Sequence, residues 1–494
     1  MEVVRVSAGD RILVGQRLVE IDEELASSVQ PGDSLLGIAA TGAVRRIPAQ
    51  VDALVDGALS EAVSAFASMG SVSDSAVTAF FAAAARLLAD DAVFAGIAEA
   101  NAGDVESAAA RGRSTTRLIL DARMRADMVA AFGMWRDSDV SMTQRATVVE
   151  HTGWTVEEWR APLGPIGFVF EGRPNVFADA TGVLRSGNVV VFRIGSDALA
   201  TARAIMQAVI TPALAESGLP SGAVVLLDSV EHAAGWRLFS DLRLALAVAR
   251  GSGTAVAELG AIAQQSGVPA SLHGTGGAWL IAGRSADADR FGRVVEHSLD
   301  RKVCNTLNVL CVVESRAAEL LPIAHAAAER AAARRGNHAR IHADAASAAH
   351  IPSLGMIEVV RPEGTTREPQ VTPTANHALG HEFEWDQTPE FHVVTVRDVP
   401  EAIALFNAHS PQFVVSVVSD DASEVESAWT GSNAPFFGDG FTRWVDGQFA
   451  LLKPELGLSN WQNGRLFGRS GVLSGDSAHS VRLRVRQSDA DLHR

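Results

Sequence analysis

The stretch IGFVFEGRPNVFADATGVLRSGNVVVFRIGSDA, at residues 166–198, decides the fold of this chain. It begins and ends with apolar runs of the length of buried strands. Further runs of this kind lie at residues 223–228, 244–250, 278–283 and 308–314. Helical stretches separate most of the runs, notably residues 198–218. This alternation of strand and helix predicts a doubly wound α/β architecture with parallel sheets.

The segments that flank this core have patterns of their own. Residues 1–50 contain short strand-like runs around the turn PGD and predict a small β-rich appendage. Residues 51–131 carry apolar positions three and four apart, which is typical of helices. Residues 145–164 alternate around a Thr-Gly turn and predict a hairpin. Together with the strand-like residues 479–487, we expect this hairpin to form an oligomerisation arm and the chain to be a homodimer.

These patterns divide the chain into four parts. We expect a β-rich N-terminal extension, two α/β domains and an oligomerisation arm. In that order, the predicted parts span residues 1–50, residues 51–144 with 162–270, residues 271–440, and residues 145–161 with 475–494.

Composition excludes several classes of protein. No run approaches the roughly 18–20 apolar residues that span a bilayer, and the N-terminus lacks the pattern of a signal peptide, so we expect a cytoplasmic protein without membrane contact. The net charge of −16 argues against a nucleic acid partner. The 14 histidines are scattered and the two cysteines do not form a CxxC pair, so no metal site is expected.

The two cysteines occupy different contexts. Cys304 follows the helix-like residues 287–300 and lies beside Arg301 and Lys302, whose positive charge would favour a thiolate that could attack a carbonyl. From position alone, a small buried core residue is an equally good interpretation of Cys304. Cys311 lies inside an apolar strand, and we expect it to be part of the core.

A dinucleotide fingerprint is present only in part. The segment GSGTAV, at residues 251–256, follows a predicted strand and opens a predicted helix, but Val256 stands where the third glycine of the motif should be. A tight strand–helix turn explains the segment equally well.

Several motifs in order resemble one family. The motif RPNV (173–176) is followed by SGNVV (186–190), GLPSG (218–222) and CNT (304–306). This series resembles the glutamate-5-semialdehyde dehydrogenases, also called γ-glutamyl phosphate reductases, of the aldehyde dehydrogenase superfamily. The resemblance runs from about residue 55 to the C-terminus. It implies an aldehyde dehydrogenase-like fold and a nicotinamide-dependent oxidoreductase with a cysteine nucleophile. Residues 51–144 with 162–270 would then form the dinucleotide-binding domain, and residues 271–440 the catalytic domain.

The resemblance also implies roles for single residues. Cys304 would be the nucleophile, and Asn175 would donate its amide to the oxyanion. The turn after the strand that ends near residue 193 would hold the cofactor ribose, and its arginine favours NADP(H) over NAD(H). The residues that would bind the cofactor are Arg193, Gly195, Ser196, Gly251 and Gly253.

An anionic acyl phosphate needs cations near the nucleophile, and the candidates are Arg301, Lys302 and Arg443. Arg301 and Lys302 could instead cap the preceding helix. Trp279 stands where the family usually carries histidine, which suggests a more apolar substrate pocket.

We therefore expect NADP-dependent reduction of an acyl phosphate, with γ-glutamyl phosphate as the leading substrate and glutamate 5-semialdehyde, for proline synthesis, as the product. The glutamate of an ELGGK-type motif, which activates water in hydrolytic aldehyde dehydrogenases, has no counterpart, since the ELG at 258–260 lies within a predicted helix. The alternatives are the same chemistry on another acid in specialised biosynthesis, a CoA-acylating or hydrolytic aldehyde dehydrogenase, and a non-enzymatic paralogue.

Overall fold

The computed structural model describes residues 6–113, 115, 117–361, 364–445, 450, 452–454, 461–462, 465–466 and 474–491. The chain divides into two compact units. The first consists of Met1–Gly274, Leu451–Leu456 and Val472–Arg494, and the second of Thr275–Ala450 and Gly457–Gly471. The chain thus leaves the first unit twice, for residues 275–450 and again for residues 457–471, and returns to it each time.

A parallel five-stranded sheet forms the centre of the first unit. Its strands are β7 (Pro165–Val169), β8 (Val189–Arg193), β9 (Val224–Leu226), β10 (Leu246–Arg250) and β11 (Ala270–His273). They lie in the order β11-β10-β7-β8-β9, so the order reverses between β7 and β10. β7 and β8 are buried along their whole length, as expected for strands covered by helices on both faces.

Helices cover both faces of this sheet. They are α2 (Ala49–Met69), α3 (Asp74–Ala89), α4 (Asp91–Ala110), α5 (Ala122–Arg136), α6 (Phe177–Thr181), α7 (Leu199–Ile205), α8 (Thr211–Ser217), α9 (His232–Phe239) and α10 (Gly253–Gln265). Right-handed crossovers bring α6 to one face and α9 and α10 to the other. α2 packs beside α9 and against β7, β8 and β9.

One helical stretch, Ser196–Ser217, is long and apolar enough to cross a membrane by length and composition alone. Half of its apolar window is buried inside the protein. Within it, α7 packs against α4 and α8 packs against α3, with a π-helical turn at Met206–Ile210 between them. These contacts identify it as a core helix of the first unit.

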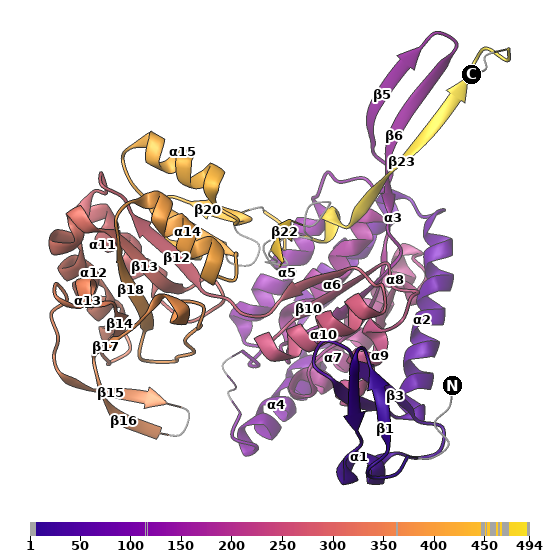
Figure 1. Cartoon of the computed structure of the whole chain (residues 1–494). Helices are drawn as coiled ribbons and strands as arrows, with labels where there is room; N and C mark the ends of the chain where they lie inside the picture. Colours follow the sequence, from indigo (N-terminus) through magenta and orange to yellow (C-terminus); the bar gives the residue numbers. More distant parts are fainter. Residues whose placement is uncertain are drawn as a thin grey trace. The chain divides into compact units, whose positions relative to one another are not determined.

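The N-terminal extension, described from residue 6 to residue 47, is rich in short strands as predicted. Its elements are β1 (Arg11–Val14), β2 (Arg17–Glu20), α1 (Glu23–Ser28), β3 (Ser34–Ile38) and β4 (Ala43–Ile47). They form two separate antiparallel hairpins, β1-β2 and β3-β4. The second hairpin contacts α9 and α10, as Figure 1 shows.

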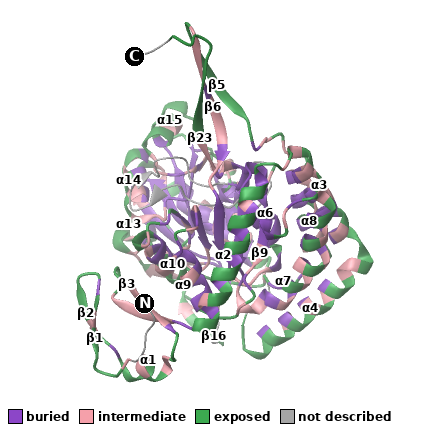
Figure 2. Ribbon diagram, turned by 90° about the vertical axis from the view of Figure 1, so that its right-hand side faces the viewer, coloured by how far each residue is buried: buried purple, intermediate pink, exposed green. Residues whose placement is uncertain are grey.

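A three-stranded antiparallel sheet projects from the first unit. It consists of β5 (Arg145–His151), β6 (Trp154–Pro162) and β23 (His479–Gln487), in the order β23-β6-β5. Most of its surface is exposed, including apolar side chains on β5 and β23 (Figure 2). The hairpin and the terminal strand thus belong to one sheet, and the oligomer that we expect from it stays a prediction.

The second unit is built on a seven-stranded parallel sheet in the order β17-β14-β18-β13-β12-β19-β20. Its strands are β12 (Ala278–Ala282), β13 (Leu307–Val313), β14 (Arg340–Ala343), β17 (Val371–Pro373), β18 (Glu390–Val396), β19 (Val414–Val418) and β20 (Phe436–Gly438). Its helices are α11 (Ala288–Ser298), α12 (Ala317–Ala333), α13 (Ala345–Ala348), α14 (Val399–His409) and α15 (Ala422–Gly431). Two short hairpins complete it, β15 (Met356–Arg361) with β16 (Gly364–Pro369) and β21 (Trp461–Gln462) with β22 (Arg465–Leu466).

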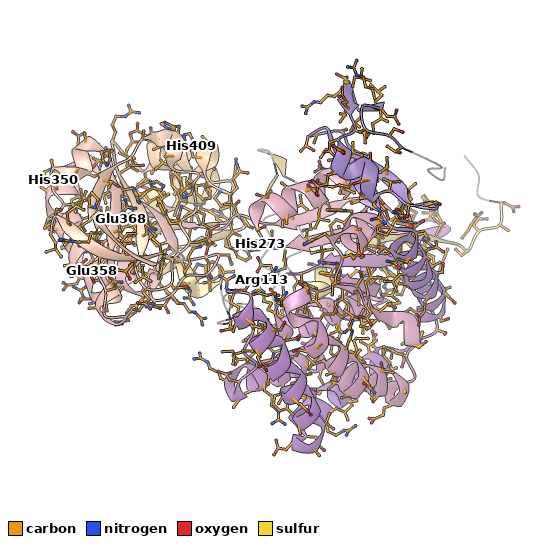
Figure 3. All side chains as sticks on the ribbon, turned by 90° about the horizontal axis from the view of Figure 1, so that it is seen from below. Arg113, His273, His350, Glu358, Glu368 and His409 are labelled. Atoms are coloured by element: carbon orange, nitrogen blue, oxygen red, sulfur yellow. The ribbon has the colours of Figure 1, made fainter. Side chains whose placement is uncertain are left out.

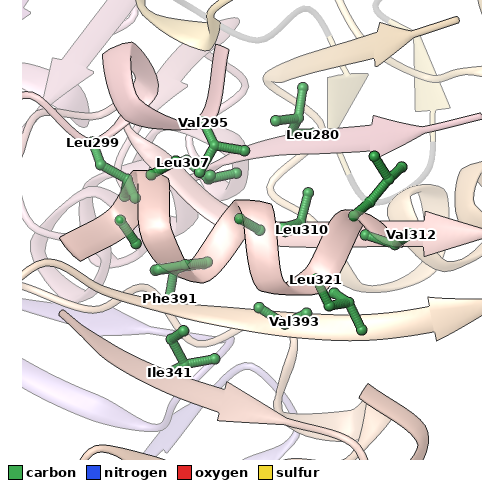
Figure 4. Packing of buried hydrophobic residues seen from close by; sticks show 14 of the residues in the cluster. Leu280, Val295, Leu299, Leu307, Leu310, Val312, Leu321, Ile341, Phe391 and Val393 are labelled. Carbon is green, nitrogen blue, oxygen red and sulfur yellow. The ribbon is translucent and has the colours of Figure 1, made fainter. Parts of the chain in front are cut away.

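Alternation along the central strands builds two cores in this unit. On β13, Leu310 and Val312 point to the face that α11 and α12 cover, with Phe391 of β18 (Figure 4). Val309 and Cys311 point to the opposite face, with α14. Since successive side chains of a strand point to opposite faces, a single strand supplies both cores.

The predicted α/β architecture with two parallel sheets is confirmed, and each predicted strand of the core corresponds to an observed one within a few residues. The strands β14, β17, β18, β19 and β20 of the second sheet were not predicted, nor were α1, β11, and the hairpin of β15 and β16.

Candidate active site

Cys304 lies in a turn between α11 and β13, at the amino edge of the seven-stranded sheet, and its side chain is half-buried. Thr306 closes this turn, since its hydroxyl donates to the carbonyl of Arg301 over 2.6 Å and accepts from the N–H of Val303 over 2.8 Å. The Cys304 carbonyl accepts a 2.7 Å hydrogen bond from the Gly277 N–H. The backbone of the turn is therefore fixed, while the cysteine side chain keeps access to solvent.

Gly276 allows this turn to approach β12 closely. A Cβ atom at position 276 would lie 2.5 Å from the Cys304 carbonyl oxygen and 2.7 Å from its Cα. Both distances are far shorter than real Cβ contacts, so a side chain here would displace the cysteine backbone. The strand lead-in of β12 and the cysteine turn fit together only with glycine at this position.

Lys302 forms a nearly buried ion pair beside the cysteine. Its Nζ contacts a carboxylate oxygen of Glu382 and lies 3.4 Å from Glu384. The other Glu382 oxygen accepts from the N–H of Gly276. Glu382 therefore connects Lys302 to the residues that precede β12 and compensates the charge of Lys302.

Arg443 is also engaged beside the cysteine turn. It lies in the short helical turn Thr442–Trp444, where its guanidinium pairs with Asp300 and lies 3.4 Å from the Arg301 carbonyl. The neighbouring Thr442 donates its hydroxyl to the Asn305 carbonyl over 2.8 Å. Thr442 and Arg443, more than 130 residues later in the chain, thus hold the cysteine turn in place. Of the three predicted cations, Arg301 is the one whose side chain is exposed.

Cys311 and Trp279 both belong to the core. Burial raises the pKa of the Cys311 thiol, as expected for a core residue, and neither cysteine forms a disulfide. Trp279 has no exposed surface and packs edge-on against Phe406 at 5.7 Å between ring centroids. The prediction that Trp279 makes the substrate pocket more apolar is wrong, because the alternation of β12 points this side chain into the α14 face of the sheet.

In the first unit, Asn175 is exposed in the short helical turn Pro174–Val176, just after β7. The turn leads directly into α6. Neither the turn Pro174–Val176 nor α6 has a side-chain hydrogen bond at its N-terminus, so Asn175 is not held there as a capping residue. Its amide is thus presented at the carboxyl edge of the five-stranded sheet.

Gly251 and Gly253 follow β10 at the same edge, and Gly253 is the first residue of α10. Ser252 precedes the helix without a side-chain hydrogen bond to it. The N-terminus of a helix presents backbone N–H groups and partial positive charge, which favour a phosphate. In open α/β sheets, ligands bind at the carboxyl edge where the strand order reverses, and β7 and β10 flank that point here.

The turn after β8 holds the other predicted cofactor residues. Gly195 packs so closely on the preceding strand connection that a Cβ atom there would lie 2.6 Å from the Gly172 nitrogen. Ser196 is half-buried and opens the helical stretch that follows. Arg193 is only 4% exposed, and its guanidinium donates to the carbonyls of Val230 and Glu231 over 3.1 Å each.

Sequence reasoning missed two arginines beside this turn. Arg111 and Arg113 follow α4 and pair with Asp197, the residue after Ser196, at 2.9 and 2.7 Å (Figure 3). Both are more exposed than Arg193. The run RGR was visible in the sequence, but its proximity to residues more than 80 positions later in the chain could only come from the fold.

A buried charged cluster at the same edge was missed as well. Arg250 of β10 pairs with Asp179 of α6 at 2.8 Å, which links the turn of Asn175 to that of Gly251. Burial raises the pKa of Asp179 despite this pair. His273, at the end of β11, has its pKa lowered to about 3 by burial and by the nearby Arg250 and Arg173, so it is neutral (Figure 3).

Comparisons with known proteins bring these observations together. The chain is 32% identical over 406 residues to the gamma-glutamyl phosphate reductase of Afipia carboxidovorans, which covers 78% of this chain and 85% of the relative. It is 27% identical over 380 residues to the enzyme of that name from Neisseria meningitidis, covering 75% and 84% of the two chains. No family model matches the chain.

Solved structures show the same fold. A gamma-glutamyl phosphate reductase from Thermotoga maritima superposes with a TM-score of 0.74 at 22% identity, over 89% of this chain and 100% of that one. A putative aldehyde dehydrogenase from Burkholderia cenocepacia gives a TM-score of 0.60 at 16% identity, over 96% and 99%. The fold is that of the aldehyde dehydrogenases, and the chain belongs to the gamma-glutamyl phosphate reductase family.

Proposed function

We propose that the protein reduces γ-glutamyl phosphate to glutamate 5-semialdehyde and orthophosphate with NADPH as reductant. The observation that carries the proposal is the 32% identity to a gamma-glutamyl phosphate reductase over most of both chains. The accessible Cys304 in a fixed turn supports it, since thioester chemistry needs a reactive cysteine with a positioned backbone.

In this proposal Cys304 is the nucleophile. Its thiolate attacks the acyl carbon, the bond from that carbon to the phosphate oxygen breaks, and orthophosphate leaves, so that a thioester forms on the cysteine. The side-chain amide of Asn175 and the backbone N–H of Cys304 donate to the oxyanion as it develops. When bound, NADPH supplies a hydride to the thioester carbon. The carbon–sulfur bond then breaks, and the thiolate returns as the aldehyde leaves.

The residues at the carboxyl edge of the five-stranded sheet fit a dinucleotide. Gly251 and Gly253 let a pyrophosphate approach the N-terminus of α10. The turn after β8, with Ser196, would hold the ribose that carries the 2′-phosphate. The arginines around this turn, Arg193 with Arg111 and Arg113, supply the positive charge that distinguishes NADP(H) from NAD(H).

The proposed reaction needs no base to activate water. Glu258, the only acid of the ELG segment, lies inside α10, where it pairs with Arg45 at 2.7 Å. It is therefore committed to a structural contact. Among the cations of the cysteine turn, we assign attraction of the anionic substrate first to Arg301, because its side chain is exposed, whereas the side chains of Lys302 and Arg443 are largely buried.

A phosphate-dependence assay tests the proposal. Oxidation of glutamate 5-semialdehyde is followed as NADPH formation, with and without phosphate, and semialdehydes of other lengths serve as comparisons. We expect formation of NADPH to require phosphate and to be fastest with glutamate 5-semialdehyde. Turnover that does not depend on phosphate would indicate a hydrolytic enzyme, and turnover only with coenzyme A would indicate a CoA-acylating one. Faster turnover with a semialdehyde of another length would show that the natural substrate is not γ-glutamyl phosphate.

We further propose a cytoplasmic homodimer that exchanges the three-stranded sheet of β5, β6 and β23. The exposed apolar residues of this sheet, among them Val149 and Leu483, need a cover, and a second copy of the chain offers one. Light scattering at micromolar concentration should give the mass of a dimer. A monomer at that concentration would contradict this assignment.

A further inference from the structure

The N-terminal extension is attached to the first unit by specific side-chain contacts. Gln265, the last residue of α10, donates its amide to the Gly37 carbonyl over 2.8 Å and accepts from the Ala39 N–H over 2.9 Å. Both backbone groups belong to the end of the β3-β4 hairpin. Ile38 between them is fully buried. The hairpin therefore has a fixed position on the C-terminal end of α10.

Arg45 of β4 makes a second attachment nearer to the start of the same helix. Its guanidinium donates two hydrogen bonds to Glu258, at 2.7 and 3.2 Å, in the forked geometry that suits a carboxylate. It also lies over the ring of Trp236, 5.4 Å from the centroid. Trp236 belongs to α9 and Glu258 to α10, so one side chain of the extension bridges two helices.

These two helices begin at the edge where the cofactor residues lie. α9 begins at His232 after β9, and α10 begins at Gly253 after β10. Trp236 and Glu258 lie within about one and a half turns of those first residues. The start of α9 is also held from the sheet, since Arg193 binds the two carbonyls that precede it. The bridge therefore acts close to the helix N-termini and not at their far ends.

We infer that Arg45 is a positioning residue for the dinucleotide: by holding α9 and α10 together near their N-termini, the extension sets the affinity of the enzyme for its nicotinamide cofactor. This inference rests on the proposed function. The position of a helix N-terminus decides how well its N–H groups meet a phosphate, and a shift of a few tenths of an ångström weakens that contact. Arg45 does not itself contact the cofactor in this assignment.

The bridge is partly exposed, which makes it suitable for a variant that keeps the fold. The side chains of Arg45 and Glu258 are 38% and 20% exposed, and ion pairs of this kind contribute little to global stability. The loss of Arg45 should therefore change the position of the helices more than the free energy of unfolding.

The test compares Arg45→Ala with Arg11→Ala in the full-length protein. Arg11 also lies in the extension, where it pairs with Glu20 at 3.3 Å on the surface of the β1-β2 hairpin. We expect Arg45→Ala to raise the KM for NADP⁺ and the Kd for NADP⁺, measured by calorimetry, by about three- to tenfold. The kcat and the KM for the semialdehyde should be unchanged, and Arg45→Lys should restore part of the affinity. Arg11→Ala should match the parent.

The outcomes separate the inference from the proposed function. If Arg45→Ala binds NADP⁺ as the parent does, or if kcat and both KM values change together, the inference is overturned while the function stands. If the parent enzyme forms no NADPH with any semialdehyde and phosphate, the proposed function fails. Should Arg45→Ala not fold, Glu258→Ala removes the same bridge from the other side, and its Kd for NADP⁺ decides in the same way.

Discussion

The two parallel sheets present their candidate residues at opposite edges. In the first unit, Asn175, Ser196 and Gly251 all follow the carboxyl ends of strands. In the second unit, Cys304 precedes the amino end of β13 and follows the C-terminus of α11. A carboxyl edge offers helix N-termini, which favour anions, whereas an amino edge offers helix C-termini, whose partial negative charge does not. The comparison shows that a parallel sheet can support cofactor binding at its carboxyl edge and a nucleophile at its amino edge.

This contrast explains the cations around the cysteine. The turn of Cys304 follows the C-terminus of α11, whose partial negative charge does not favour a thiolate, so the thiolate needs positive charge from side chains. Lys302 and Arg443 lie at this end of the helix, each with a carboxylate partner. We therefore expect variants at the amino edge of the second sheet to change kcat or the KM for the aldehyde, and variants at the carboxyl edge of the first sheet to change the KM for the cofactor.

The largest effect should come from Cys304→Ser. A hydroxyl has a far higher pKa than a thiol and is a much weaker nucleophile near neutral pH, so kcat should fall by roughly three orders of magnitude or more. NADP⁺ binding by calorimetry should be unchanged. The matched control is Cys311→Ser, which places a hydroxyl in the core and should lower the free energy of unfolding by about 1–3 kcal/mol while leaving kcat near that of the parent. Activity of Cys304→Ser within tenfold of the parent would refute the nucleophile.

Asn175→Ala probes the exception to the contrast, since Asn175 lies at the carboxyl edge but is assigned to chemistry. Loss of an oxyanion donor should lower kcat by about 10²–10³-fold, with an unchanged KM for NADP⁺. Steady-state kinetics in both substrates measures this split. If only the KM for NADP⁺ changed, Asn175 would be a cofactor-binding residue. All candidate residues at the carboxyl edge of the first sheet would then bind the cofactor.

Gly251→Ala sharpens the contrast at the cofactor edge. A Cβ atom at position 251 would have its nearest contact at 3.4 Å, so the chain itself accommodates alanine. The added methyl group would meet the dinucleotide, and the KM for NADP⁺ should rise by about tenfold while the melting temperature stays the same. Gly195→Ala is the matched comparison, because its Cβ atom would meet the Gly172 backbone at 2.6 Å and should lower the melting temperature. An unchanged KM in Gly251→Ala would remove this glycine from the cofactor site.

Arg301→Ala tests the cations at the amino edge. Loss of the exposed guanidinium should raise the KM for the carboxylate-bearing semialdehyde by about fivefold and leave that of a neutral aldehyde of similar length unchanged. Arg443→Ala, which leaves Asp300 without this partner, should instead lower the melting temperature and affect both aldehydes equally. If Arg443→Ala weakened activity only with the carboxylate-bearing semialdehyde, and Arg301→Ala did not, then Arg443 would bind the substrate and Arg301 would be structural.

The smallest effect is expected for Arg193→Ala. Its guanidinium already binds two carbonyls, so the preference for NADPH over NADH should narrow by only about threefold. Arg113→Ala, at the more exposed arginine of the same turn, should narrow the preference at least as much. Equal loss with both cofactors in Arg193→Ala would show that this residue only holds the start of α9.

The sequence predicted the elements better than the partners of their side chains. Apolar runs located β7, β8, β10, β12 and β13, and the order of short motifs singled out Cys304 and Asn175. The partner of Lys302 is Glu382, which comes from a segment 80 positions later, and no local pattern marks it. Trp279 was misplaced because a motif comparison says which residue differs but not to which face of a strand it points. Arg45 was overlooked because its role exists only after the extension has packed on α9 and α10.

The return of the chain to the first unit sets an order on its synthesis. Ser186 donates its hydroxyl to the Gly475 carbonyl over 2.9 Å, and Asn188 donates to the Ala478 carbonyl over 2.6 Å. β23, which follows, completes the three-stranded sheet with β6. A ribosome synthesises these residues only after the whole seven-stranded sheet. Most of the first unit is therefore synthesised early, but its last segment, which includes β23, is synthesised late. During translation, the polar groups of Ser186 and Asn188 and the edge of β6 are without these partners, which is the interval in which a nascent chain is open to wrong pairing and to chaperones.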